Sequence, residues 1–132
     1  MDAWLGALGS IDELALRAAR DPKHAVDALL VRGRIAEGRA DWTAAEQLYR
    51  RVISDQPDNA AALNNLAFVI AQSRARLSKA LPYVKRAAAL QPEQPDILDT
   101  YATVLHGLGR LDEAHDALTK AWRLAPRMSQ SA

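Results

Sequence analysis

Proline recurs along this chain at a nearly constant interval, and each of these prolines follows a pair of segments with helical periodicity. Pro57, Pro92 and Pro126 lie 35 and 34 residues apart. In residues 96–126, two apolar stripes at steps of three and four residues are separated by a glycine-containing turn. A helix pair that repeats with this period cannot bury its apolar face alone and must stack on its neighbours. The spacing therefore predicts an all-α solenoid of antiparallel helix pairs.

Three such units fit the chain, with a shorter segment at each end. The units are residues 26–59, 60–94 and 95–128. Residues 1–25 are expected to hold a flanking helix, at about 11–20, that covers one end of the array. Its start is predicted from Ser10 and Glu13, which fit a capping box. Residues 129–132 form a short polar tail.

Cap and turn residues predict the helix boundaries within the units. The first unit should contain helices at about 25–38 and 42–55, with Asp41 as the N-cap of the second. Asn59 should cap the first helix of the next unit. Pro95 suits the first position of the helix that it begins.

The second unit is one residue longer than its neighbours, and the extra residue falls in a turn without glycine, at 73–76. Ser78 is the expected cap of the helix that follows. Pro82 lies four residues further on, where a proline removes a helical hydrogen bond. We therefore expect an irregular helix start near 78–81.

Small residues recur at matching places in all three units, and this pattern resembles the tetratricopeptide repeat, a helix–turn–helix unit of 34 residues. Small side chains let the two helix axes of a unit approach closely. Of twelve positions compared, eleven match the family pattern, and Val52 is the exception. The resemblance covers residues 26–128 and implies a right-handed superhelix. The compared positions are Gly33, Ala67, Ala102, Ala45, Ala80, Ala114, Val52, Ala87, Ala121, Pro57, Pro92 and Pro126.

Local sequence similarity and the distribution of apolar residues indicate the source and the compartment of the protein. The segments NNLAFVIAQ and DTYATVL are similar to terminal repeats of large bacterial tetratricopeptide proteins, and the bias to arginine over lysine suits a GC-rich bacterium. No apolar run approaches the length of a membrane span, and the N-terminus lacks the basic start of a signal peptide. The sequence therefore predicts a soluble protein without direct membrane insertion, in the cytoplasm, or in the periplasm if a longer parent carries a signal.

The charge balance argues against nucleic acid as a partner. The chain has 17 basic and 16 acidic side chains, so its formal net charge is +1. A phosphate-binding surface needs an excess of positive charge. The RNA-reading pentatricopeptide repeat also fits the small-residue pattern less well.

The resemblance also implies where a partner binds, because the first helices of stacked tetratricopeptide repeats line a concave groove. Acidic residues outnumber basic ones among the expected groove positions, so the partner should be a basic or neutral protein segment. Phe68 is either an anchor for an apolar partner side chain or a cover for a neighbouring helix. The expected groove residues are Asp27, Leu30, Arg34, Glu37, Asn64, Asn65, Phe68, Gln72, Asp96, Asp99, Thr103 and His106.

Two other uses are disfavoured by the residues. Family members that bind the acidic tails of heat-shock chaperones carry basic and amide residues at positions where this chain has Leu30, Arg34, Asp96 and Thr100, and only Asn65 matches their pattern. Asp96 would repel a carboxylate. An enzymatic role lacks support, because no nucleophile, phosphate loop or metal-ligand spacing accompanies His106. No cofactor or metal is expected.

The second helix of the last unit leaves an apolar edge without a covering helix. Leu118, Trp122 and Leu124 form this edge, and uncovered apolar patches of this kind favour association. Either the chain continues into a longer array, or the edge meets another subunit. The leading hypothesis is thus a non-catalytic scaffold that holds a protein segment in its groove. The alternative is a structural module that self-associates through this edge.

Overall fold

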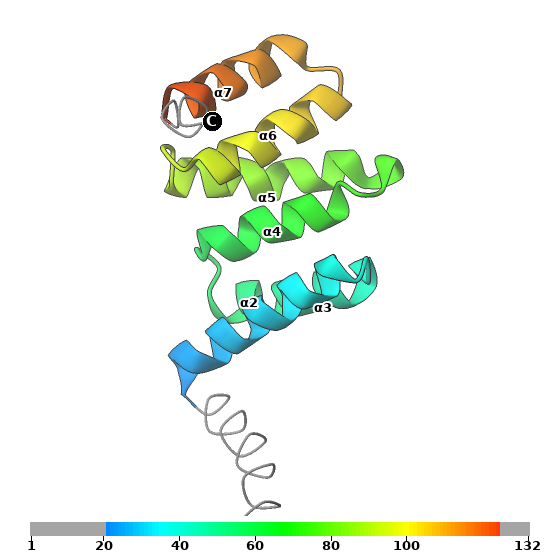
Figure 1. The fold of residues 1–132 in the computed structure, drawn as a ribbon, viewed down its shortest axis with the longest axis vertical. Coiled ribbons are helices and arrows are strands. Elements are labelled where there is room, and N and C mark those ends of the chain that lie inside the picture. Colours follow the sequence, from blue (N-terminus) through cyan, green and yellow to red (C-terminus); the bar gives the residue numbers. More distant parts are fainter. Residues whose placement is uncertain (1–20, 125–132) are drawn as a thin grey trace, which may run out of the picture.

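The computed structural model describes residues 21–124 as a stack of helices (Figure 1). The predicted helix at 11–20, its capping box and the tail at 129–132 lie outside the described residues. The helices are α2 (Pro22–Gly38), α3 (Trp42–Asp55), α4 (Ala60–Ile70), α5 (Leu77–Leu90), α6 (Pro95–Gly107) and α7 (Leu111–Leu124), with a 3-10 helix, η1 (Arg74–Arg76), between α4 and α5.

The helices follow one another along the long axis as three antiparallel pairs, α2 with α3, α4 with α5, and α6 with α7 (Figure 1). Each pair also packs on the next, through α3 against α4 and α5 against α6. The predicted all-α solenoid of helix pairs is therefore confirmed. None of the helices within the described residues is long and apolar enough to cross a membrane.

Side-chain caps explain the starts of three of the described helices, α2, α3 and α4. The Asp41 carboxylate accepts a hydrogen bond from the Ala44 amide at 3.2 Å, as expected for the N-cap of α3. The Asn59 side chain likewise accepts from the Ala62 amide at 3.0 Å and caps α4. Pro95 occupies the first turn of α6, as predicted. The first helix starts at Pro22 rather than near residue 25, because Asp21 caps it and the proline suits its first turn.

The start of α5 differs from the prediction. The irregular backbone is η1, at Arg74–Arg76, several residues before the expected place at 78–81. Helix α5 begins at Leu77, so Ser78 lies inside the helix and is not its cap. Pro82 is accommodated within α5. The extra residue of the second repeat is therefore taken up by a 3-10 turn.

The crossing of α2 and α3 has no room for a side chain at Gly33. A Cβ atom built on Gly33 would lie 2.5 Å from Cε1 of Tyr49, which is a severe overlap. Tyr49 is fully buried, and so are its core neighbours Ala45 and Leu66. The ring of Tyr49 thus occupies the space that the missing side chain leaves, as the close-packing argument predicts.

We predict that Gly33→Ala destabilises the protein by about 1–3 kcal/mol, because the added methyl group forces the buried Tyr49 ring to move. Gly38→Ala is the matched control, since its Cβ would meet no atom within 4 Å and the same helix ends there. The control should be neutral or stabilising by up to about 1 kcal/mol. Urea unfolding followed by circular dichroism measures both, and equal effects of the two variants would contradict this account.

An ion-pair network on the outer side fixes η1 to the preceding repeat. Arg76 donates two hydrogen bonds to the Glu46 carboxylate of α3, at 2.7 and 2.9 Å. Arg50 donates to the same carboxylate at 2.9 Å. The hydrogen bond from Arg76, followed by the bond from Arg50 and the charges of both guanidiniums, lowers the pKa of Glu46 to about 2, against the opposing effect of burial.

Because the folded-state pKa of Glu46 lies below its usual value of 4.5, the ionised carboxylate stabilises the fold at neutral pH. This contribution is lost as the pH falls from about 4.5 toward 2. We predict that Glu46→Gln costs about 1–2 kcal/mol at pH 7, and that the difference from the unmodified protein disappears near pH 2. Urea unfolding of both proteins across this pH range measures this difference in unfolding free energy.

Glu93→Gln is the control for this experiment, since Glu93 is exposed and forms no ion pair within residues 21–124. It should leave the unfolding free energy within about 0.5 kcal/mol of the unmodified protein at every pH. A pH-independent loss in Glu46→Gln would mean that packing, and not charge, is what the variant removes.

Candidate functional site

The first helices of the three pairs together line one hollow, with a volume of about 310 Å³. Helices α2, α4 and α6 each contribute residues to it. Seven of the expected groove residues lie together in this hollow, and Thr100 joins them from α6. The lining is Arg34, Glu37, Asn64, Asn65, Phe68, Asp96, Asp99 and Thr100.

Helix periodicity explains why these side chains converge. Within each helix the lining positions are one, three or four residues apart, so they lie on one helical face. The opposite faces of the same helices are buried, for example at Leu63 and Leu66 of α4 and at Leu98 of α6. The core pattern of each first helix therefore also determines which side chains face the groove.

The hollow is net acidic. It combines three carboxylates, those of Glu37, Asp96 and Asp99, with the single guanidinium of Arg34. Asp96 and Asp99 are exposed and form no ion pair within residues 21–124. A cationic side chain in the hollow would meet two carboxylates that no other described residue neutralises.

Glu37 is held in place by the core. The Tyr49 hydroxyl, at the end of a fully buried ring, donates a hydrogen bond to the Glu37 carboxylate. Burial raises the pKa of Tyr49 well above its ordinary value, and the bond to Glu37 raises it further. The hydroxyl therefore remains a neutral donor, and one groove carboxylate has a fixed position.

Phe68 has features of both expected roles. Its ring meets that of Trp42 edge to face, with centroids 6.3 Å apart and planes at 69°. The residue is still 39% exposed and lines the hollow. Trp42 supports one side of the ring, which leaves part of the ring as apolar surface in the groove.

Asn64 lines the hollow and carries a hydrogen-bond acceptor that no described residue satisfies. Its side-chain oxygen is buried and has no hydrogen-bond partner within the described part of the chain. A buried acceptor without a partner is energetically costly. Because the oxygen itself is buried, it is shielded from the open hollow that the residue lines.

Five other expected groove residues do not line this hollow. Leu30 is half-buried and packs against the core. The side chain of Gln72 donates to the Phe68 carbonyl, and the hydroxyl of Thr103 donates to the Asp99 carbonyl, so both bond within their own segment. The five are Asp27, Leu30, Gln72, Thr103 and His106.

The residues of the expected self-association edge are exposed. Trp122 is 63% exposed, Leu118 49% and Leu124 39%. Trp122 and Leu118 line a second hollow of about 310 Å³, together with Pro95 and the groove residues Asp96 and Asp99. The same two carboxylates thus border the groove on one side and the edge on the other.

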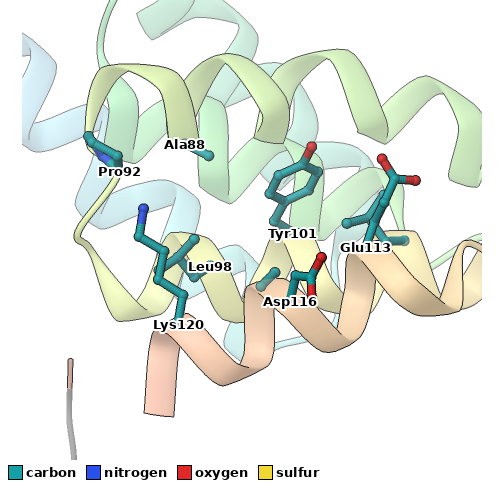
Figure 2. A pocket seen from close by; sticks show the side chains of 9 residues that line it. Ala88, Pro92, Leu98, Tyr101, Glu113, Asp116 and Lys120 are labelled. Atoms are coloured by element: carbon teal, nitrogen blue, oxygen red, sulfur yellow. The ribbon is translucent and has the colours of Figure 1, made fainter. Parts of the chain in front are cut away.

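A third hollow, of about 320 Å³, lies on the other side of α6, in the furrow between α5 and α7 (Figure 2). Tyr101 and Leu98 of α6 line it, and Ala117 of α7 is one of its small residues. In Figure 2, Lys120 and Pro92 are at one end and Glu113 is at the other. The repeat pattern did not indicate this furrow.

Helix pairs that repeat with this period and cross at small residues define a class of α-solenoid repeat proteins. None of the protein-family models compared matches the chain. A curated relative, the TPR repeat-containing protein PA4667 of Pseudomonas aeruginosa, is 35% identical over 98 residues, which are 74% of this chain and 17% of that protein.

Solved structures agree on the fold. An O-GlcNAc transferase of Thermobaculum terrenum matches with a TM-score of 0.77 and 26% identity, over 80% of this chain and 20% of that one. The first TPR of Spaghetti (RPAP3), bound to an HSP90 peptide, matches with a TM-score of 0.71 and 18% identity, over 76% of this chain and 79% of that one. The chain is a tetratricopeptide repeat protein. It spans about a fifth of the length of the curated relatives that it matches.

Proposed function

We propose that the chain is a non-catalytic scaffold whose concave groove binds an extended, basic or neutral segment of another protein. The observation that supports this most directly is the hollow, in which α2, α4 and α6 each place polar side chains around the exposed part of Phe68. Protein interaction is a general use of such repeats, and the Spaghetti (RPAP3) structure holds a peptide.

The chemistry of the hollow suggests what each part of a bound segment would do. A lysine or arginine would pair with Asp96 and Asp99, which are exposed and form no ion pair with another described residue. The side-chain amides of Asn64 and Asn65, which line the hollow, would hydrogen-bond to the backbone of the segment. An apolar side chain would cover Phe68. The peptide in the Spaghetti structure, SRMEEVD, is acidic at its end, and the carboxylates in this hollow disfavour such a ligand.

Selection from a random peptide library on the immobilised chain tests this proposal. We expect the selected peptides to be enriched in lysine or arginine. The double variant Asp96→Asn/Asp99→Asn should weaken their binding about tenfold or more in titration calorimetry, and added salt should weaken binding to the unmodified chain.

The double variant Glu93→Gln/Asp112→Asn is the charge-matched control, because it also removes two negative charges and both residues are exposed and lie outside the hollow. It should bind the peptides as the unmodified chain does. Selection of acidic peptides, or equal losses in the control and the groove double variant, would refute the groove proposal. Phe68→Ala separates the apolar contribution from the charge contribution.

A second candidate function is self-association through the edge, which the exposure of Trp122 and Leu118 favours. Another subunit placed there would cover the hollow between α6 and α7. The groove proposal therefore gives the binding role in the third repeat to α6, whereas the edge proposal gives it to α7.

Sedimentation velocity over a concentration series tests the edge. If it mediates association, the sedimentation coefficient should rise with concentration, and Trp122→Glu should keep the protein monomeric because it places a charge on the apolar surface. Val31→Glu is the control, since Val31 is 57% exposed on α2 at the other end of the stack. A monomer at every concentration would eliminate this candidate.

A further inference from the structure

Two equivalent furrows lie between successive second helices, and only one of them is filled by a large side chain from its own helices. The first furrow separates α3 from α5, and the second separates α5 from α7. Tyr83 of α5 and Ala117 of α7 are one repeat, 34 residues, apart in sequence. Ile53 of α3 and Ala88 of α5 are likewise related, with a separation of 35 residues that includes the extra residue of the second repeat.

Tyr83 fills the first furrow. Its half-buried ring packs against the core. Arg50 of α3 lies over this ring, with its guanidinium carbon 5.6 Å from the centroid, and donates a hydrogen bond of 3.0 Å to the hydroxyl. A tyrosine with an arginine beside it thus joins α3 to α5.

The second furrow has the smaller alanines at both matching places and contains the hollow of about 320 Å³. Tyr101 and Leu98 provide its apolar floor (Figure 2). Ala117 also lines it and matches Tyr83 in the repeat. Within residues 21–124, no hydrogen bond or ion pair joins a side chain of α5 to one of α7. The volume reaches the lower end of the range, about 300–1,000 Å³, that is usual for ligand sites.

The charged rim of the hollow is not uniform. Glu113 is already paired with Arg110 of the same segment. Asp116 is exposed and forms no ion pair within the described residues, and it lines the hollow. A basic group that accompanies an apolar ligand would therefore meet its charge partner at Asp116.

We propose that the α5–α7 furrow is a second protein-binding surface, which accepts a tyrosine side chain of a partner protein with an adjacent arginine on Asp116. The occupant is chosen by comparison within the molecule, since the equivalent furrow is filled by a tyrosine that an arginine covers. Lys120, at the far end, is a donor for the tyrosine hydroxyl. This surface is distinct from the concave groove, and neither proposal depends on the other.

Titration of the ¹⁵N-labelled chain with N-acetyl-tyrosyl-arginine amide, followed by amide NMR shifts, tests the proposal. We expect saturable shifts in residues 98–105 and 113–120. N-acetyl-alanyl-arginine amide should bind roughly tenfold more weakly or not measurably, because it lacks the aromatic anchor. Asp116→Asn should weaken binding of the tyrosine peptide about twofold to fivefold.

Two variants that fill the furrow provide an independent readout. Ala117→Tyr reproduces the residue of the first furrow, and Ala88→Ile reproduces the matching aliphatic residue. Both should abolish the shifts at residues 98–105, and Ala117→Tyr should also raise the unfolding temperature because it buries an aromatic ring.

Several outcomes would overturn the proposal. One is the absence of shifts in the furrow with the tyrosine peptide, and another is equal shifts with the alanine peptide. Binding that persists in a folded filling variant would also refute it. Shifts of the same residues that grow with protein concentration without peptide would show that a second copy is the occupant, which contradicts the assignment to a partner protein.

Discussion

The close approach of two helices within each repeat is the constraint on which the rest of the structure depends. It is seen directly between α2 and α3, where the absent side chain of Gly33 leaves the space for the buried ring of Tyr49. That ring extends to the concave side, where its hydroxyl holds the Glu37 carboxylate. The packing of Tyr49 in the core therefore also fixes the position of the Glu37 carboxylate in the groove.

Different features of the sequence determine the surfaces on the two sides of the stack. On the concave side, regular stacking of the first helices brings Arg34, Phe68 and Asp99 into one hollow, although they come from three repeats. On the outer side, particular large side chains decide whether a furrow is closed, as Tyr83 does between α3 and α5. The periodic positions thus determine the groove, whereas individual residues determine the outer surface.

This division explains what the sequence predicts and what it does not. Small residues at a period of 34 or 35 predict the fold, and the resemblance to the tetratricopeptide repeat that they support implies which helix faces line the groove. The bond of Tyr49 to Glu37 and the bridge from Arg76 to Glu46 join residues far apart in the sequence at positions without a shared pattern. The furrow beside Ala117 is open because an alanine stands where Tyr83 fills the equivalent furrow. The shared repeat pattern does not specify the residue at this position.

The placement of Asp96 and Asp99 couples the two candidate functions of the third repeat. Both carboxylates border the groove hollow and the edge hollow, so a basic segment in the groove would neutralise charge beside Leu118 and Trp122. Neutralisation would make the edge less polar and favour apolar association there. The proposed groove and edge interactions are therefore expected to reinforce each other, whereas the α5–α7 furrow shares no lining residue with either hollow.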